Sequence, residues 1–292
     1  MNKFILLLIS ISLAVFSCAT QAPQEEVVSN VETPEGEAKE PVLVPKQIQE
    51  TIYVITKESS FYSDGILDTK FEGSYDEEGT PKTLTTFTNM GDVKEKLVYK
   101  KSGSTLTVTN YNGSNEVQDI TVSDMNEYGW LVKEVLKTGD EEILSQSTYE
   151  NNNNGDPTVW KAYDGDNALL AVTEYTYDEE GNKTKTTFSD QSGSLTGTIE
   201  YKYNKGNLVD EVYQNADGSI DKRIKREYKG DVLVKTLYYS GEKALRRQET
   251  YENDADGNAI KVNYLDKRGN LLEYKERTFE PRTAIKTILV WE

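Results

Sequence analysis

Tyr175-Thr176-Tyr177-Asp178-Glu179-Glu180-Gly181-Asn182 is the stretch that decides the fold, because it returns along the chain. One copy reads Tyr-Lys-Tyr-Asn-Lys-Gly-Asn over residues 201–207, and another reads Tyr-Glu-Asn-Asp-Ala-Asp-Gly-Asn over residues 251–258. Each copy ends in a polar turn with a glycine, the residue that adopts most easily the positive φ of tight hairpins. The stretch therefore predicts a repeated β-hairpin.

Glycines in polar turns extend this pattern over most of the chain. They form two interleaved series, each with a period of about 25 residues, and two turns per period mean a strand, a turn, a strand and a turn in every repeat. The first series comprises Gly79, Gly103, Gly129, Gly155, Gly181, Gly206, Gly230 and Gly257. The second comprises Gly65, Gly91, Gly113, Gly139, Gly165, Gly193, Gly218, Gly241 and Gly269.

Residues between the turns alternate as in β-strands. Leu195, Ile199 and Tyr201 fall on one face, whereas Thr196 and Glu200 fall on the other. A period of two in Val, Ile, Thr and Tyr indicates strands. We expect an all-β fold, a long antiparallel meander of about sixteen strands in eight repeats of about 25 residues, as a single-layer or curled sheet.

From Tyr75 to Glu280 these motifs resemble the YD-repeat (RHS-type) family, whose units read roughly Tyr-x-Tyr-Asp-x-x-Gly-Asn. They are also similar to the MORN-type repeats of some antitoxin-annotated proteins. The resemblance implies a hairpin array. The chain shows no counterpart of the core and toxin tail that follow the array in large RHS proteins, so a toxin-shell function is not implied.

The first residues predict export. Lys3 precedes an apolar run from Phe4 to Phe16, which is too short for a permanent membrane helix and is typical of a signal peptide over residues 1–17. The run ends in Val-Phe-Ser-Cys18, which resembles the lipobox of bacterial lipoproteins. That resemblance implies cleavage before Cys18 and lipidation of it, with acyl chains as the membrane contact. An ordinary signal peptide with an incidental cysteine is the alternative.

A tether and a repeat domain should follow. Residues 18–49 carry four prolines, six glutamates and no aromatic residue, so we expect a disordered spacer there and the repeat domain over residues 50–292. Ala19 stands where enterobacterial sorting places an aspartate for inner-membrane retention, and this resemblance favours the outer membrane. The expected location is the cell envelope, on its periplasmic or its surface face.

The composition excludes several kinds of chemistry. Removal of residues 1–17 takes one lysine from the net charge of −17 and leaves −18, and such an acidic surface disfavours nucleic acid. The chain has no histidine, so Ser-His-Asp catalysis and histidine-bearing metal sites are excluded. Cys18 is its only cysteine. We expect no cofactor and no enzymatic activity.

Three local patterns could still mark sites. Asp254 to Asn258 looks like half a calcium loop, but the closing glutamate is absent at the required spacing, and a hairpin turn is the favoured interpretation. Carboxylate pairs are numerous and none has a distinguishing context. Trp130, Trp160 and Trp291 could form a sugar- or peptide-binding platform, although tryptophans more often pack on strands.

The expected function is a lipid-anchored envelope protein with a structural or binding role that engages protein or glycan through an extended sheet face. An antitoxin-like or immunity protein and a carboxylate-dependent hydrolase are the alternatives. A transmembrane barrel would need one apolar face, whereas Lys222 and Arg226 lie on the more apolar face of their strand. The last strand, residues 284–291, should either cap the array or offer an edge for strand addition.

Overall fold

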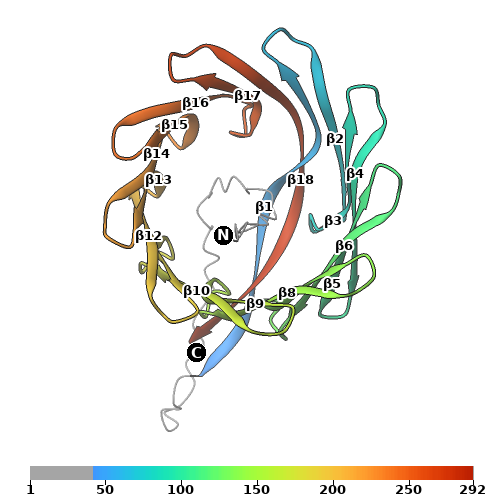
Figure 1. Ribbon diagram of the computed structural model, residues 1–292, viewed down its shortest axis with the longest axis vertical. Coiled ribbons are helices and arrows are strands. Elements are labelled where there is room, and N and C mark those ends of the chain that lie inside the picture. Colours follow the sequence, from blue (N-terminus) through green and yellow to red (C-terminus); the bar gives the residue numbers. More distant parts are fainter. Residues whose placement is uncertain (1–41, 292) are drawn as a thin grey trace, which may run out of the picture.

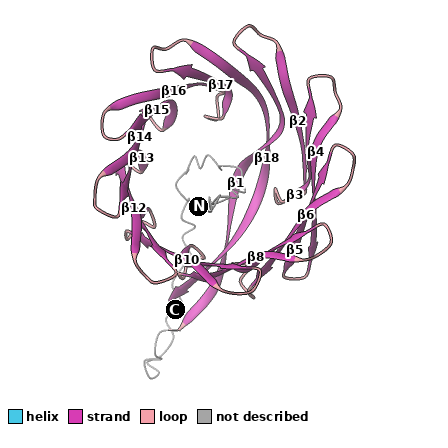
Figure 2. Cartoon of the chain, in the orientation of Figure 1, coloured by secondary structure: helices cyan, strands magenta, loops and turns pink. Residues whose placement is uncertain are grey.

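A computed structural model describes residues 42–291, which form one antiparallel sheet of 18 strands and no helix (Figures 1 and 2). No helix in this range is therefore long and apolar enough to cross a membrane. The strands are β1 Leu43–Tyr62, β2 Leu67–Tyr75, β3 Pro81–Thr88, β4 Val93–Ser102, β5 Thr105–Asn112, β6 Val117–Met125, β7 Leu131–Thr138, β8 Ile143–Asn151, β9 Pro157–Asp164, β10 Leu169–Tyr177, β11 Lys183–Asp190, β12 Leu195–Asn204, β13 Asn207–Asn215, β14 Ile220–Lys229, β15 Val232–Ser240, β16 Ala244–Asn253, β17 Ala259–Asp266 and β18 Leu271–Trp291.

The sheet closes into a barrel, so the expectation of an open or merely curled sheet of about sixteen strands was wrong. Every strand pairs with the next along the chain, and β18 pairs with β1 from Tyr62↔Glu273 to Leu43↔Trp291 (Figure 1). Closure removes the unpaired edges that an open sheet would expose to other chains. Barrels of this strand number leave an aqueous channel.

The first and last strands are the longest, with 20 and 21 residues. β1 begins at Leu43, so the expected boundary between tether and repeat domain at residue 50 lies too late. The segment from Leu43 to Gln49 includes Pro45 and has no turn repeat that would predict a strand. It is a strand because residues 285–291 at the far end of the chain pair with it.

Only part of this terminal pair belongs to the barrel wall. Lys57–Phe61 pair with both β2 and β18, whereas Leu43–Ile55 pair with Phe279–Trp291 alone. We call this second part the ribbon. A register shift at Thr56 marks its start, and such bulges bend a strand. The ribbon crosses the ring and its end projects beyond the wall near β9 (Figure 1).

One face of the sheet carries most of the tyrosines, and we call it the tyrosine face. It holds Tyr75, Tyr99, Tyr149, Tyr175, Tyr177, Tyr201, Tyr203, Tyr213, Tyr228, Tyr238, Tyr251 and Tyr264. Of the thirteen buried strand residues outside the ribbon, ten lie on this face and three on the other. Side chains on the concave side of a closed sheet converge, so the tyrosine face lines the inside of the barrel.

The second tyrosine of the repeat motif has a defined structural role. Its hydroxyl donates to a backbone carbonyl twenty residues earlier, and asparagine replaces it in two repeats. Except for Ile55, the acceptor of Tyr75, each carbonyl lies just after the preceding turn. The contacts are Tyr75–Ile55 (2.8 Å), Asn151–Leu131 (2.9 Å), Tyr177–Pro157 (2.7 Å), Tyr203–Lys183 (3.1 Å), Tyr228–Leu208 (2.9 Å) and Asn253–Leu233 (3.0 Å). The motif therefore links consecutive hairpins around one rim.

The outer face carries charged side chains at the middle of the strands. Lys185 lies opposite Glu200, Lys161 lies beside Val172, and Arg223 forms an ion pair with Asp210. The expectation that Lys222 and Arg226 share one face of their strand is confirmed, but that face is the inner one. Lys222 and Arg226 point inward, and it is Arg223, Lys225 and Glu227 that β14 presents on the outside.

Candidate binding site inside the barrel

Paired charges and tyrosines form a belt on the inner wall between β11 and β1. Its ionisable members are Glu58, Lys183, Glu211, Lys222, Arg226, Arg247, Glu249, Lys275 and Arg277. Glu211 is 7% exposed and accepts from Arg226 Nη2 at 2.7 Å and from the Tyr213 hydroxyl at 2.9 Å. Nη1 of Arg226 is buried without a hydrogen-bond partner among the described residues, so the belt retains a donor.

Glu249 is the centre of a second cluster in the belt. The Tyr238 hydroxyl donates to its Oε2 at 3.0 Å, and the Tyr251 hydroxyl donates to the same atom at 2.8 Å. Arg247 Nη2 lies 3.4 Å from Oε1. Carboxylates in both clusters therefore orient phenol and guanidinium groups along the wall.

Glu58 joins the two ends of the chain at the barrel seam. Lys275 Nζ and Arg277 Nε each lie 2.7 Å from its carboxylate oxygens, across the β1–β18 pairing. Burial alone would raise the pKa of Glu58, but the two cations outweigh burial and hold the pKa below its ordinary value. The seam is therefore tied by charge as well as by backbone hydrogen bonds.

Cations also lie against tyrosine rings in the belt. Lys222 Nζ is 3.8 Å from the centroid of Tyr213, and Arg247 Cζ is 4.0 Å from that of Tyr238. Lys183 Nζ is 4.6 Å from the ring of Tyr175, and burial lowers its pKa. Such cation–π contacts are worth about 0.5–2 kcal/mol and hold both groups in place.

The inner wall of β4 to β9 differs in charge. Within residues 42–291, Glu134 on β7 has only the Ser123 hydroxyl as a hydrogen-bond partner, at 3.3 Å, and burial raises the pKa of Glu134. Tyr149 and Trp160 lie side by side on the adjoining strands β8 and β9. This side of the lumen therefore offers aromatic rings and a carboxylate without a cation beside it.

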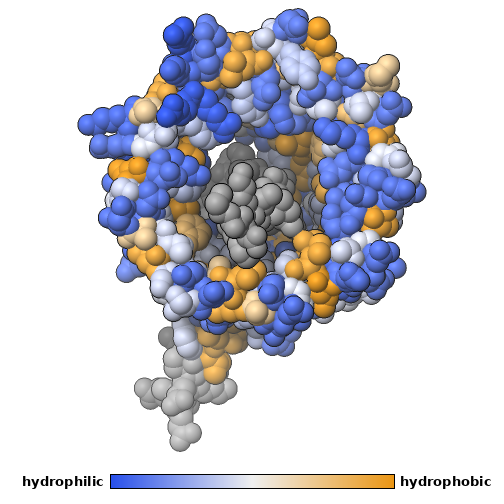
Figure 3. Space-filling view, viewed as in Figure 1, coloured by the Kyte–Doolittle hydropathy of each residue, from blue (hydrophilic) through white to orange (hydrophobic). Residues whose placement is uncertain are grey.

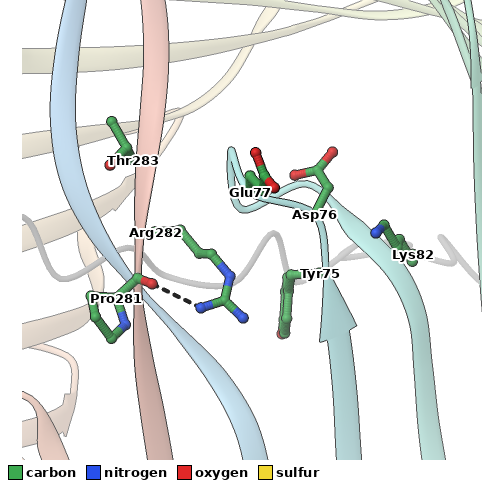
Figure 4. A pocket seen from close by; sticks show the side chains of 7 residues that line it. All are labelled: Tyr75, Asp76, Glu77, Lys82, Pro281, Arg282 and Thr283. Atoms are coloured by element: carbon green, nitrogen blue, oxygen red, sulfur yellow. Dashed lines mark hydrogen bonds between the residues drawn. The ribbon is translucent and has the colours of Figure 1, made fainter.

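The ribbon crosses one mouth of the barrel and is fixed to its rim. Trp130 Nε1 donates to the Thr287 carbonyl at 2.8 Å, and the Leu289 amide donates to the Asn153 carbonyl at 2.7 Å. Nearer the wall, Arg282 leans toward Tyr75 over a shallow groove beside the β2–β3 turn (Figure 4). The lumen is therefore obstructed at this end, and the turns of the second glycine series surround the other.

Gly155 tests the attachment of the ribbon. It has a φ of 80°, and a Cβ there would lie 2.5 Å from Nε1 of Trp130, whereas Gly129 has the same φ and an added Cβ would meet nothing within 4 Å. Both alanine variants should lose about 1–2 kcal/mol to backbone strain. Gly155→Ala should lose about 1–3 kcal/mol more, because it pushes Trp130 off Thr287. Denaturant unfolding measures both, and equal losses would contradict the attachment.

The structure separates most residues that the sequence had singled out. Cys18 and the signal segment lie outside the described residues. Trp130 is at the rim, Trp160 is on the inner wall and Trp291 is at the end of the ribbon with 65% exposure, so the three form no platform.

The half calcium loop is a hairpin turn. Asp254 Oδ1 accepts from the Asp256 amide at 3.0 Å and the Asn258 amide at 2.9 Å, as the turn interpretation predicts. Among residues 42–291 no three carboxylates gather as a metal site would require. The belt was not predicted from the sequence, although tyrosine at alternate positions of the strands was a signal of it there.

No family model matches the chain, and no curated protein does. Among solved structures, it is similar to a porin-like protein from Bacteroides vulgatus, with 13% identity, 77% of this chain and 98% of that chain covered and a TM-score of 0.42. It is also similar to a porin-like protein from Bacteroides uniformis, with 11% identity, 82% of this chain and 96% of that chain covered and a TM-score of 0.38. The Tc holotoxin pore of Photorhabdus luminescens gives 9% identity and a TM-score of 0.22, and only 15% of that chain is covered. Likenesses of this identity and TM-score show no function for this chain.

Proposed function

We propose that this chain is a lipid-tethered protein of the cell envelope whose water-filled barrel binds a glycan on its inner wall. The observation that carries the proposal is the belt of oriented tyrosines, cations and carboxylates enclosed by the ring. The proposal moves the expected binding surface from an exposed sheet face to the lumen, because closure leaves the wall no free edge.

The address rests on the first 18 residues. The apolar run that ends at Cys18 supports export and acylation, and two or three acyl chains would give a stable anchor. The proposal includes location at the outer membrane and kinship with YD-repeat proteins. Both rest on the sequence motifs.

The charged outer wall supports a barrel that stands in water. A membrane barrel presents an apolar band about 25 Å tall to lipid, and a lysine or arginine at the bilayer midplane costs about 2–4 kcal/mol. Outer-face charges such as Lys185, Glu200 and Lys161 would each incur this cost. A tether that holds the barrel above the membrane avoids it.

The chemistry of the belt favours a glycan. Aromatic rings stack on the apolar faces of sugar rings, and paired carboxylates and guanidinium groups provide acceptors and donors in fixed positions for sugar hydroxyls. Tyr149 and Trp160 offer further rings across the lumen. A peptide ligand would also use such groups and is the other outcome of the test below.

Two lysines of β14 provide matched variants. Lys222 lies over Tyr213 on the inside, whereas Lys225 lies 6.0 Å from the ring of Tyr239 on the outside. Isothermal titration against a panel of oligosaccharides should find a ligand whose affinity falls about five- to tenfold in Lys222→Ala and is unchanged in Lys225→Ala. Equal effects of the two variants, or peptide binding without glycan binding, would contradict the proposal.

A further inference from the structure

The end of the ribbon is an exposed apolar tip. Leu43 pairs with Trp291 and Val44 with Val290, and Val42 precedes them. Val42 is 60% exposed, Leu43 36% and Trp291 65%. In Figure 3 hydrophobic residues lie directly below the ring, where the ribbon leaves it. Apolar groups gathered at a projecting end favour an interface.

The chain leads from this tip directly to Cys18. Twenty-four positions separate Val42 from Cys18, so the tip can stand at most about 85 Å from a lipid attached there. The membrane would therefore be the nearest large partner of the tip.

We propose that the tip docks into the headgroup region of the membrane as a second attachment point of the barrel. This inference rests on the proposed tether at Cys18. Tryptophan suits that depth, because its ring is apolar and its N–H can bond to water or headgroups. The buried area is small, but attachment at Cys18 makes docking intramolecular, so a weak contact suffices.

Charge near the tip fits zwitterionic lipid. Lys46 is exposed beside the tip, and Lys286 lies 3.4 Å from Asp156. The acidity of the chain opposes contact with anionic headgroups, and these two cations reduce that acidity only near the tip. Headgroups without net charge therefore suit the tip. Two attachment points would fix the orientation of the barrel, with the β8–β9 turn that binds Leu289 nearest the membrane.

The experiment supplies the tether chemically. Residues 18–292 with Cys18 as the only thiol are coupled to a maleimide phospholipid in phosphatidylcholine vesicles whose acyl chains carry bromine, a short-range quencher of tryptophan. The Trp291→Phe variant is the control, since it keeps Trp130 and Trp160 in the barrel. Wild-type fluorescence should be quenched, and this quenching should be lost in Trp291→Phe.

Equal quenching of the two proteins would overturn docking. So would Trp291 emission that is already blue-shifted without vesicles, because the tip would then be covered by this chain or a second copy. Mass spectrometry of the protein from its native membrane tests acylation of Cys18 separately. The two measurements therefore distinguish a chain that is not acylated at Cys18 from a tip that does not dock.

Discussion

Truncation after Asp266, which removes β18, is expected to abolish the cooperative unfolding transition. The loss leaves β17 and β1 as unpaired edges and removes Lys275 and Arg277 from Glu58. A wall held mainly by its closure then has few buried apolar side chains to stabilise it, since among residues 42–291 the buried hydrophobic residues of the wall are Ile199, Val212 and Val262. Calorimetry and circular dichroism measure the effect.

A shorter truncation provides the control. Removal of residues 279–292 deletes the ribbon strand but leaves Leu271–Thr278 in the wall, so the ring stays closed. This variant should still unfold cooperatively, with a lower Tm because the rim contacts are lost. If both truncations unfold alike, β18 does not close the barrel. Because residues 284–291 pair with β1 in the ribbon, they are neither the end cap of an open array nor a free edge for strand addition.

Alkaline pH should unfold the protein over a narrow range. Burial raises the pKa of all twelve tyrosines of the tyrosine face, and it raises that of Tyr75 to about 12 from an ordinary value of 10. A raised pKa in the folded state stabilises the fold fully below the unfolded pKa, and this contribution is lost as pH rises through the folded one. The loss should fall between about pH 10 and 12.

Ultraviolet absorbance of phenolate and far-ultraviolet circular dichroism should therefore change together in that range. Protein in denaturant is the control, where the tyrosines titrate independently near their ordinary pKa. A gradual titration of the folded protein near pH 10 with unchanged dichroism would show that the tyrosines are accessible to water. The tyrosine face would then not line a crowded inner wall.

The turns and strands could be predicted from the sequence because they are encoded locally. Glycine turns and period-two alternation predicted a strand that begins at Leu195, and the structure has it over Leu195–Asn204. Closure could not be predicted, since the pairing of Glu58 with Arg277 joins positions with no shared motif. Alternation put Lys222 and Arg226 on one face of their strand, but it could not show that this face is the inner one, because both faces carry lysine.

The candidate site was less predictable than the fold. Tyr175 and Tyr177 were recognised as a motif, but their roles differ: one is part of the inner wall, and the other holds the neighbouring hairpin. The charged clusters unite β1, β13, β14, β16 and β18, and no local pattern brings Glu58 to Lys275. Such contacts follow from the ring and become visible only when it is closed.

A disulfide between Ser59 and Glu276 tests closure most directly. These residues pair on the outer face of β1 and β18, within the geometry that a disulfide requires, whereas an open sheet of 18 strands would hold them roughly 80 Å apart. The Ser59→Cys/Glu276→Cys variant should oxidise within one chain, seen as a reducible shift in gel mobility and a cross-linked peptide. Ser59→Cys/Thr148→Cys, with its second thiol on β8, should not. Absence of the intramolecular bond in the first variant, or its presence in both, would contradict the closed barrel.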